Sequence, residues 1–144
     1  MPFLLHPQLS ADTYEVTRLA LCSVRLMNDR RFPWLVLVPQ REDVTELFDL
    51  DEDDRVLLME EVVLACTVMR DLYQAEKLNV AALGNQVPQL HVHVIARFRH
   101  DAAWPKPVWG VGTPKPYSSH EAETTVGALQ DAFARNMPAE EEDD

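Results

Sequence analysis

The sequence predicts an α+β fold in which helices cover one face of an antiparallel sheet. Three observations lead to this prediction. Apolar runs typical of strands occur in two pairs, a long segment with helical periodicity separates the pairs, and a second capped helix follows them. The order contains no internal repeat and no linker long enough to divide the chain, so we expect residues 1–138 to form a single domain.

The first pair of strands is predicted over residues 13–38. Residues 13–28 carry apolar and β-branched residues in strand-like runs that end near Asn28, where Asn-Asp-Arg-Arg favours a turn. The nearly all-apolar residues 34–38 stop at Pro39, which is typical of a buried strand. We expect the two strands to form an antiparallel hairpin. Residues 40–52 are polar, with a helical turn predicted near residues 44–48.

A long helix is predicted over residues 53–75. The acidic residues 51–54 supply a cap and favourable negative charge at its N-terminus. The stripe of apolar residues at helical spacing consists of Leu58, Val62, Ala65, Met69 and Leu72. Four further apolar residues broaden this stripe, namely Val56, Met59, Val63 and Cys66. We therefore expect a largely buried helix, with Met59 and Met69 filling the core.

The second pair of strands is predicted over residues 78–83 and 90–98, joined by the loop 84–88. Arg97 and Arg99 are interpreted as ordinary charges at the strand end, the alternative being that they attract nucleotide phosphates. Residues 104–116, rich in proline and tryptophan, are predicted to be irregular, and Ser118 with Glu121 forms a capping box for a last helix that ends near residue 135. Residues 139–144 are an acidic tail that we expect to be disordered.

Composition excludes several classes of protein. A net charge of −11 argues against nucleic-acid binding, which requires a basic face. No segment approaches the roughly 20 apolar residues of a membrane span, and the N-terminus has no basic region typical of a secretory signal. Cys22 and Cys66 lie among apolar neighbours and are expected to be reduced core residues. These features predict a cytoplasmic protein.

The most informative stretch is Gln-Leu-His-Val-His-Val-Ile at residues 89–95. Because side chains alternate along a strand, Gln89, His91 and His93 share one face, with successive members roughly 6.6 Å apart. That spacing is about the span of a phosphate with its oxygens. A neutral imidazole is a good nucleophile toward phosphorus, and a covalent phospho-imidazole intermediate would split a displacement into two easier steps.

The pattern alone leaves three interpretations open. His91 and His93 have the spacing of a catalytic pair, and also that of two ligands in a zinc or iron site, although no motif links them to a third ligand. The third interpretation is two histidines whose polar atoms are satisfied at the surface of a sheet.

Residues 87–97 resemble the signature of the histidine triad (HIT) superfamily, which is His-φ-His-φ-His-φ-φ with φ apolar. The order of the upstream elements is also similar. The resemblance implies a HIT-like fold, with an antiparallel sheet of about five strands, a long helix and a C-terminal helix, and a homodimer. It implies hydrolysis or transfer at the α-phosphate of a nucleoside phosphate conjugate, such as a dinucleoside polyphosphate, through a nucleotidyl-histidine. No cofactor or metal is implied, since histidines and backbone amides carry the phosphate charge.

The resemblance also implies roles for single residues. His91 matches the nucleophile, and His93 matches the histidine that contacts phosphate or the bridging atom. Gln89 stands at the first motif position, where the main-chain carbonyl orients the nucleophilic ring. The implied substrate-binding residues are Asn28, near the nucleoside, and Asn85 and Gln86, near phosphate.

Trp104 and Trp109 follow the motif strand directly and are held among prolines. They are interpreted either as a rigid aromatic wall near the substrate or as a dimer contact. The alternative is a structural flap over the edge of the sheet.

The sequence departs from the family pattern at three places. Gln89 replaces the first histidine, the Gly-rich stretch is shortened to residues 84–86, and residues 32–34 read Phe-Pro-Trp where the family has Pro-Gly-His. The first departure removes a titratable group, so we expect leaving groups that need little protonation, such as phosphoanhydrides or acyl phosphates, over phosphoramidates. Two rival functions are a nucleotide-binding module with little turnover and a metal-binding protein that uses the His-x-His pair.

Overall fold

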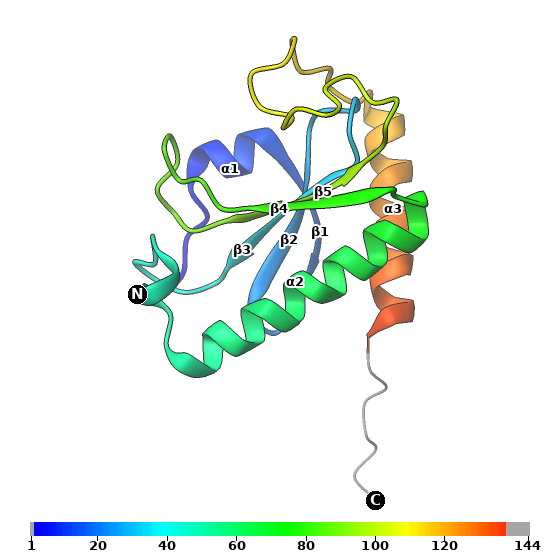
Figure 1. The fold of residues 1–144 in the computed structure, drawn as a ribbon. Helices are drawn as coiled ribbons and strands as arrows, with labels where there is room; N and C mark the ends of the chain where they lie inside the picture. Colours follow the sequence, from blue (N-terminus) through cyan, green and yellow to red (C-terminus); the bar gives the residue numbers. More distant parts are fainter. Residues whose placement is uncertain (1, 138–144) are drawn as a thin grey trace, which may run out of the picture.

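Five strands form an antiparallel sheet in the computed structural model, which describes residues 2–137 (Figure 1). The strands are β1 (Thr13–Arg18), β2 (Cys22–Met27), β3 (Trp34–Pro39), β4 (Lys77–Ala81) and β5 (Val92–Arg97). Their order is β1-β2-β3-β5-β4, so β5, the strand of the histidine motif, lies inside the sheet between β3 and β4. The predicted α+β fold with an antiparallel sheet is confirmed.

Two long helices, α2 (Glu52–Tyr73) and α3 (Ser119–Asn136), pack on one face of the sheet and enclose the main core. Asp51 caps α2 by accepting a hydrogen bond of 2.8 Å from the amide of Asp54. At the start of α3, Ser118 and Glu121 form the predicted capping box. Both helices therefore begin where the local sequence supplies oxygen atoms for the free amides of the first turn.

The opposite face carries a second, smaller core beneath the short helix α1 (Pro7–Asp12) and the irregular loop of residues 98–118 (Figure 1). The prediction that only one face is covered is therefore wrong. All six residues of β3 are buried because both of its faces are covered. A helix of six residues and an irregular loop leave no apolar periodicity in the sequence, which explains why this layer was not expected.

The segment expected as one strand over residues 13–28 is two strands, β1 and β2, joined at Leu19–Leu21. This turn contains no glycine, proline or asparagine that would have indicated it. The buried carboxylate of Glu61, on α2, instead accepts hydrogen bonds of 2.9 and 2.8 Å from the amides of Leu21 and Cys22. A contact distant in the sequence thus stabilises the turn. The helical turn predicted near residues 44–48 is a short 3-10 helix at Leu47–Asp49.

The expectation that α2 is largely buried is only half right. Its main apolar stripe is covered, and Met69 is fully buried. By contrast, Val56, Met59 and Val63 are 58%, 63% and 56% exposed, so Met59 does not fill the core. These residues repeat at helical spacing and form an uncovered apolar stripe along α2.

Both cysteines are free, with Cys22 buried and Cys66 partly buried. Burial is the main cause that raises the pKa of each thiol above its ordinary value. Among residues 2–137, no helix has the length and apolar character needed to cross a membrane. The acidic tail predicted for residues 139–144 lies outside the described residues.

Candidate functional site

His91 and His93 lie on the same face of the sheet, as strand alternation predicts. His91 directly precedes β5 and His93 lies within it, and their ring centroids are 5.0 Å apart. Val92, Val94 and Ala96 point to the opposite side, into the main core under the helices. The histidines therefore face the second core, and their residues are only 7% and 4% exposed. Such burial of two imidazoles requires partners for their ring nitrogens.

The ring of His91 is held by a main-chain carbonyl. Its Nδ1 lies 2.7 Å from the carbonyl oxygen of Gln89. A carbonyl oxygen only accepts hydrogen bonds, so Nδ1 must carry the proton. In the neutral ring the lone pair is then on Nε2. The His91 ring is thus fixed in the tautomer that a nucleophilic imidazole needs.

The ring of His93 is held by Trp34 in the opposite sense. The indole Nε1 of Trp34 donates a hydrogen bond of 2.9 Å to Nδ1 of His93. An indole N–H only donates, so Nδ1 carries the lone pair and Nε2 carries the proton. Burial, together with the neighbouring His91, lowers the pKa of His93 from 6.5 to about 4, so the ring is neutral at pH 7. The pair thus combines a lone pair on one Nε2 with an N–H donor on the other.

Trp109 completes an aromatic cluster around His93. Its ring centroid lies 5.0 Å from that of His93 and 5.7 Å from that of Trp34, with nearly perpendicular planes. Trp109 is thus beside the histidines, where the interpretation as an aromatic wall requires it. Trp104 is elsewhere, with the guanidinium of Arg97 5.7 Å from its ring centroid.

Arg97 anchors the loop that carries Trp109. Its side chain is 2% exposed and forms an ion pair of 2.8 Å with Asp101, while its Nη2 donates to the carbonyl of Lys106. Asp101 also accepts hydrogen bonds from the amides of Phe98, Ala103 and Trp104. The interpretation of Arg97 as an ordinary strand-end charge is therefore wrong: it is buried and organises the loop.

A second ion pair holds the far end of this loop. Arg31 lies 2.8 Å from Asp29, and its Nη1 donates to the carbonyl of Val111. Asp29 is buried and also accepts from the amide of Lys115. Hydrogen bonds from Arg31 and from backbone amides outweigh burial and lower the pKa of the Asp29 carboxyl.

Asn28 lines a cavity of about 240 Å³ that also reaches Trp34. The Oδ1 of Asn28 accepts a hydrogen bond of 2.8 Å from the amide of Tyr117, which leaves its Nδ2 group to face a ligand. The remaining lining residues are Ala11, Asp12, Met27, Asp29 and Pro114. Trp34 borders this cavity and also contacts His93, although neither histidine is among the residues that line the cavity. Sequence reasoning missed Trp34 as a site residue, since its apolar surroundings indicated only a buried strand.

Three polar residues, Asn85, Gln86 and Gln89, precede the histidines in the chain. Asn85 and Gln86 are exposed in the loop between β4 and β5, and within residues 2–137 their side chains make no hydrogen bond. The side chain of Gln89 does not join the histidine rings. Its amide is bonded to Leu4 and His6 of the N-terminal segment.

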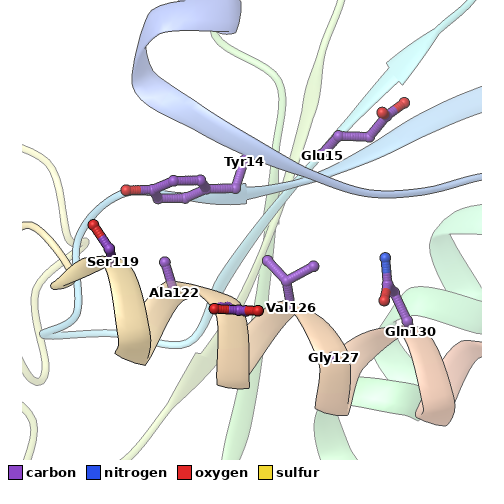
Figure 2. A pocket seen from close by; sticks show the side chains of 8 residues that line it. Tyr14, Glu15, Ser119, Ala122, Val126, Gly127 and Gln130 are labelled. Atoms are coloured by element: carbon purple, nitrogen blue, oxygen red, sulfur yellow. The ribbon is translucent and has the colours of Figure 1, made fainter.

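A larger cavity, of about 640 Å³, lies between β1 and α3 (Figure 2). Figure 2 shows the ring of Tyr14 over the first turns of α3, from which Val126 and Gln130 project toward β1, while the side chain of Glu15 points away from the helix. This cavity is on the helix-covered face, so the sheet separates it from the histidines. Its lining contains no histidine, cysteine or cation.

No group of three histidine, cysteine, aspartate or glutamate side chains in residues 2–137 is arranged to hold a metal ion. Within this part of the chain, His91 and His93 therefore lack a third protein ligand. The arrangement offers no support for the interpretation of the pair as a zinc or iron site.

Comparisons with known proteins find a family profile and several solved structures that resemble this chain. The family profile of the HIT domain matches residues 8–100. A histidine triad protein from Bradyrhizobium japonicum is 43% identical, with a TM-score of 0.89 over 92% of this chain and 99% of that chain. One from Sinorhizobium meliloti is 45% identical, with a TM-score of 0.88 over 90% and 96%. One from Marinobacter aquaeolei is 39% identical, with a TM-score of 0.91 over 95% and 100%. No curated protein matches the sequence.

The low pKa of His93 predicts how its substitution changes the dependence of stability on pH. The unfolded chain protonates His93 below about pH 6.5, whereas the folded protein does so only near pH 4. Stability from this group is therefore complete at pH 7 and is lost as pH falls from 6.5 to 4. In His93→Gln, the free energy of unfolding should fall about 2 to 3 kcal/mol less between pH 7 and pH 4.5 than in the wild type.

Urea unfolding at both pH values measures this difference. The same substitution at the exposed His100 is the matched control. If wild type and His93→Gln lose the same free energy between pH 7 and pH 4.5, the pKa of His93 is not lowered.

Proposed function

This chain belongs to the histidine triad (HIT) family, and from that premise we propose that it is a nucleotide hydrolase or nucleotidyl transferase. The reaction takes place at the α-phosphate of a nucleoside phosphate conjugate, such as a dinucleoside polyphosphate. The observation that carries the proposal is the complementary pair of tautomers, with a lone pair on Nε2 of His91 beside an N–H on Nε2 of His93. We expect the reaction in the cytoplasm, where both thiols stay reduced.

In the first step, Nε2 of His91 attacks the α-phosphorus. The new P–N bond forms as the bond from phosphorus to the leaving group breaks, and the leaving group departs with the bonding electron pair. The His91 ring becomes cationic, so its Nδ1–H bond to the carbonyl of Gln89 strengthens as the bond to phosphorus forms. The Nε2–H of His93 donates to a phosphate oxygen and stabilises the charge that develops there.

In the second step, water attacks phosphorus on the nucleotidyl-His91 intermediate. The P–N bond breaks, its electron pair returns to Nε2, and the proton of the attacking water passes to solvent. In a transferase, another nucleophile takes the place of water. The same nitrogen thus serves first as nucleophile and then as leaving group, and the neutral tautomer is regenerated.

We assign the nucleoside to the cavity beside Trp34. The Nδ2 group of Asn28 would donate to the nucleoside, and the carboxylate of Asp12 would accept from its hydroxyl groups. Trp109 forms the wall beside the phosphate. Asn85 and Gln86 remain proposed phosphate contacts, which requires their exposed loop to close on the substrate. Trp104 acts through Arg97, by holding the loop that carries Trp109.

We also propose that the protein is a homodimer, with a second copy covering the uncovered stripe of α2. Val56, Met59 and Val63 are each more than half exposed. Val80 of β4 is 50% exposed and pairs with Val94 of the main core, so it faces the same side of the sheet as α2. β4 is one of the two edge strands of the sheet, so the apolar stripe of α2 and this edge both favour association.

The first prediction concerns the covalent intermediate. Incubation with a dinucleoside polyphosphate should give a wild-type protein whose intact mass includes one nucleotidyl group, released by acid because P–N bonds are acid-labile. His91→Ala should give no adduct and should lower turnover by at least about a thousandfold. His100→Ala controls for loss of an imidazole. Equal weak rates in the wild type and His91→Ala, with no adduct in either, would favour the binding module.

The second prediction concerns the leaving group. Gln89 stands in place of a histidine, and His93 is neutral at working pH. The side chains of residues 89, 91 and 93 therefore have little capacity to act as a general acid. Hydrolysis of a dinucleoside polyphosphate should therefore exceed that of an AMP-amine conjugate at neutral and alkaline pH. The measurement is kcat/KM for both substrates from pH 5 to 9. Equal or faster release of the amine across this range contradicts the expectation.

The third prediction concerns the dimer. Met59→Glu places a charge in the centre of the apolar stripe and should shift the protein from dimer to monomer in sedimentation velocity. Met137→Glu introduces the same change at a residue that is 45% exposed at the end of α3, and should leave the dimer intact. A wild-type protein that is monomeric at all concentrations contradicts this assembly.

A further inference from the structure

The side chain of Gln89 is fully engaged with the N-terminal segment. Its Nε2 donates a hydrogen bond of 2.9 Å to the carbonyl of Leu4, and its Oε1 accepts one of 2.8 Å from the amide of His6. These are the two groups on either side of Leu5 that a neighbouring parallel strand would engage. A primary amide can bind both at once because it carries a donor and an acceptor on the same carbon.

The N-terminal segment lies on the same face of the sheet as the histidines. Phe3 and Leu5 pack against the second core, while Leu4 between them is 79% exposed. Beyond this alternating segment, Nδ1 of His6 accepts from the amide of Gln8 and caps α1. The segment is therefore fixed at one end by α1 and along its length by Gln89.

The main chain of Gln89 holds the nucleophile that the proposed function requires. Its carbonyl accepts the Nδ1–H of His91, and that bond sets the His91 tautomer. The ladder between β3 and β5 begins only at Val92, so the carbonyl of Gln89 lies outside the sheet. The peptide group that carries this carbonyl has one main-chain anchor, the hydrogen bond from the amide of Leu90 to the carbonyl of Val44. The side-chain amide of Gln89 adds a second anchor, to the N-terminal segment.

We propose that Gln89 is a positioning residue whose side-chain amide clamps residues 4–6 and thereby fixes the carbonyl that orients His91. On this view the glutamine does not replace a catalytic histidine in its chemistry. It secures the segment that leads into β5. The inference rests on the proposed function in taking His91 as the nucleophile.

Two substitutions break the clamp from opposite sides. Gln89→Met keeps the length of the side chain and removes both hydrogen bonds. His6→Pro removes the amide that donates to Gln89, and the φ of −55° at His6 suits proline. Gln130→Met is the matched control, because Gln130 makes a single side-chain bond to Val16 on the other face. His6→Ala keeps the amide and loses only the α1 cap, so it separates the cap from the clamp.

The primary measurement is the tautomer of His91 from long-range ¹H–¹⁵N correlation spectra, which requires no turnover. Wild type, Gln130→Met and His6→Ala should carry the proton on Nδ1, whereas Gln89→Met and His6→Pro should show a mixture with Nε2–H. In the same two variants, kcat for a dinucleoside polyphosphate should fall by about tenfold to a hundredfold with KM changed less. Thermal melts confirm that each variant is folded. If His6→Pro is not folded, the tautomer of His91 in Gln89→Met decides the test.

An unchanged His91 tautomer in folded Gln89→Met overturns the clamp, and if the wild type forms the nucleotidyl adduct the proposed function still stands. If the wild type shows no turnover, the proposed function fails, and the comparison of His91 tautomers still decides whether the clamp exists. A mixed tautomer in both Gln89→Met and Gln130→Met also overturns it, because the effect would then be general loosening of the fold.

Discussion

The site depends on two hydrogen bonds to ring nitrogens that work in opposite directions. A carbonyl accepts from Nδ1 of His91, and an indole donates to Nδ1 of His93. Neither partner can reverse its role, because a carbonyl has no proton to give and an indole N–H has no lone pair. The outward nitrogens are therefore different before any substrate arrives. This difference makes two buried imidazoles a candidate site for attack on phosphorus, as opposed to two interchangeable rings.

Strand register brings the Trp34 indole to His93. Trp34 pairs with Ile95 and Val36 pairs with His93, so Trp34 is the diagonal neighbour of His93 on the same face. A shift of one residue between β3 and β5 would turn the indole into the helix-covered core. The loop above is fixed independently by the pairs Arg97–Asp101 and Arg31–Asp29. The charge of each arginine is balanced by its aspartate partner. The proposed contacts to phosphate are therefore made by neutral N–H donors.

Much of this arrangement follows from the sequence, because it depends on local periodicity. Alternation along the motif places His91 and His93 on one face, and the capping residues locate both long helices. The partners of these residues are distant in the chain and leave no local signal: Trp34 is 59 residues from His93, and Leu4 is 85 residues from Gln89. Periodicity shows on which side of a helix an apolar residue lies, but it does not show whether another element covers that side. Met69 lies in the main stripe of α2 and Met59 among the residues that broaden it; both were expected to fill the core, yet only Met69 is buried.

The replacement of a histidine by Gln89 links the chemistry of the site to its support. Neither histidine offers an acidic proton, since Nδ1–H of His91 is bonded to a carbonyl and His93, with a pKa near 4, is a neutral ring whose Nε2–H donates a hydrogen bond without being released. Such a pair stabilises negative charge by hydrogen bonding and has little capacity to deliver a proton to a departing group. A third imidazole would have added that capacity. The amide of Gln89 instead binds the N-terminal segment. The residue at this position therefore holds the nucleophile in place and does not transfer a proton.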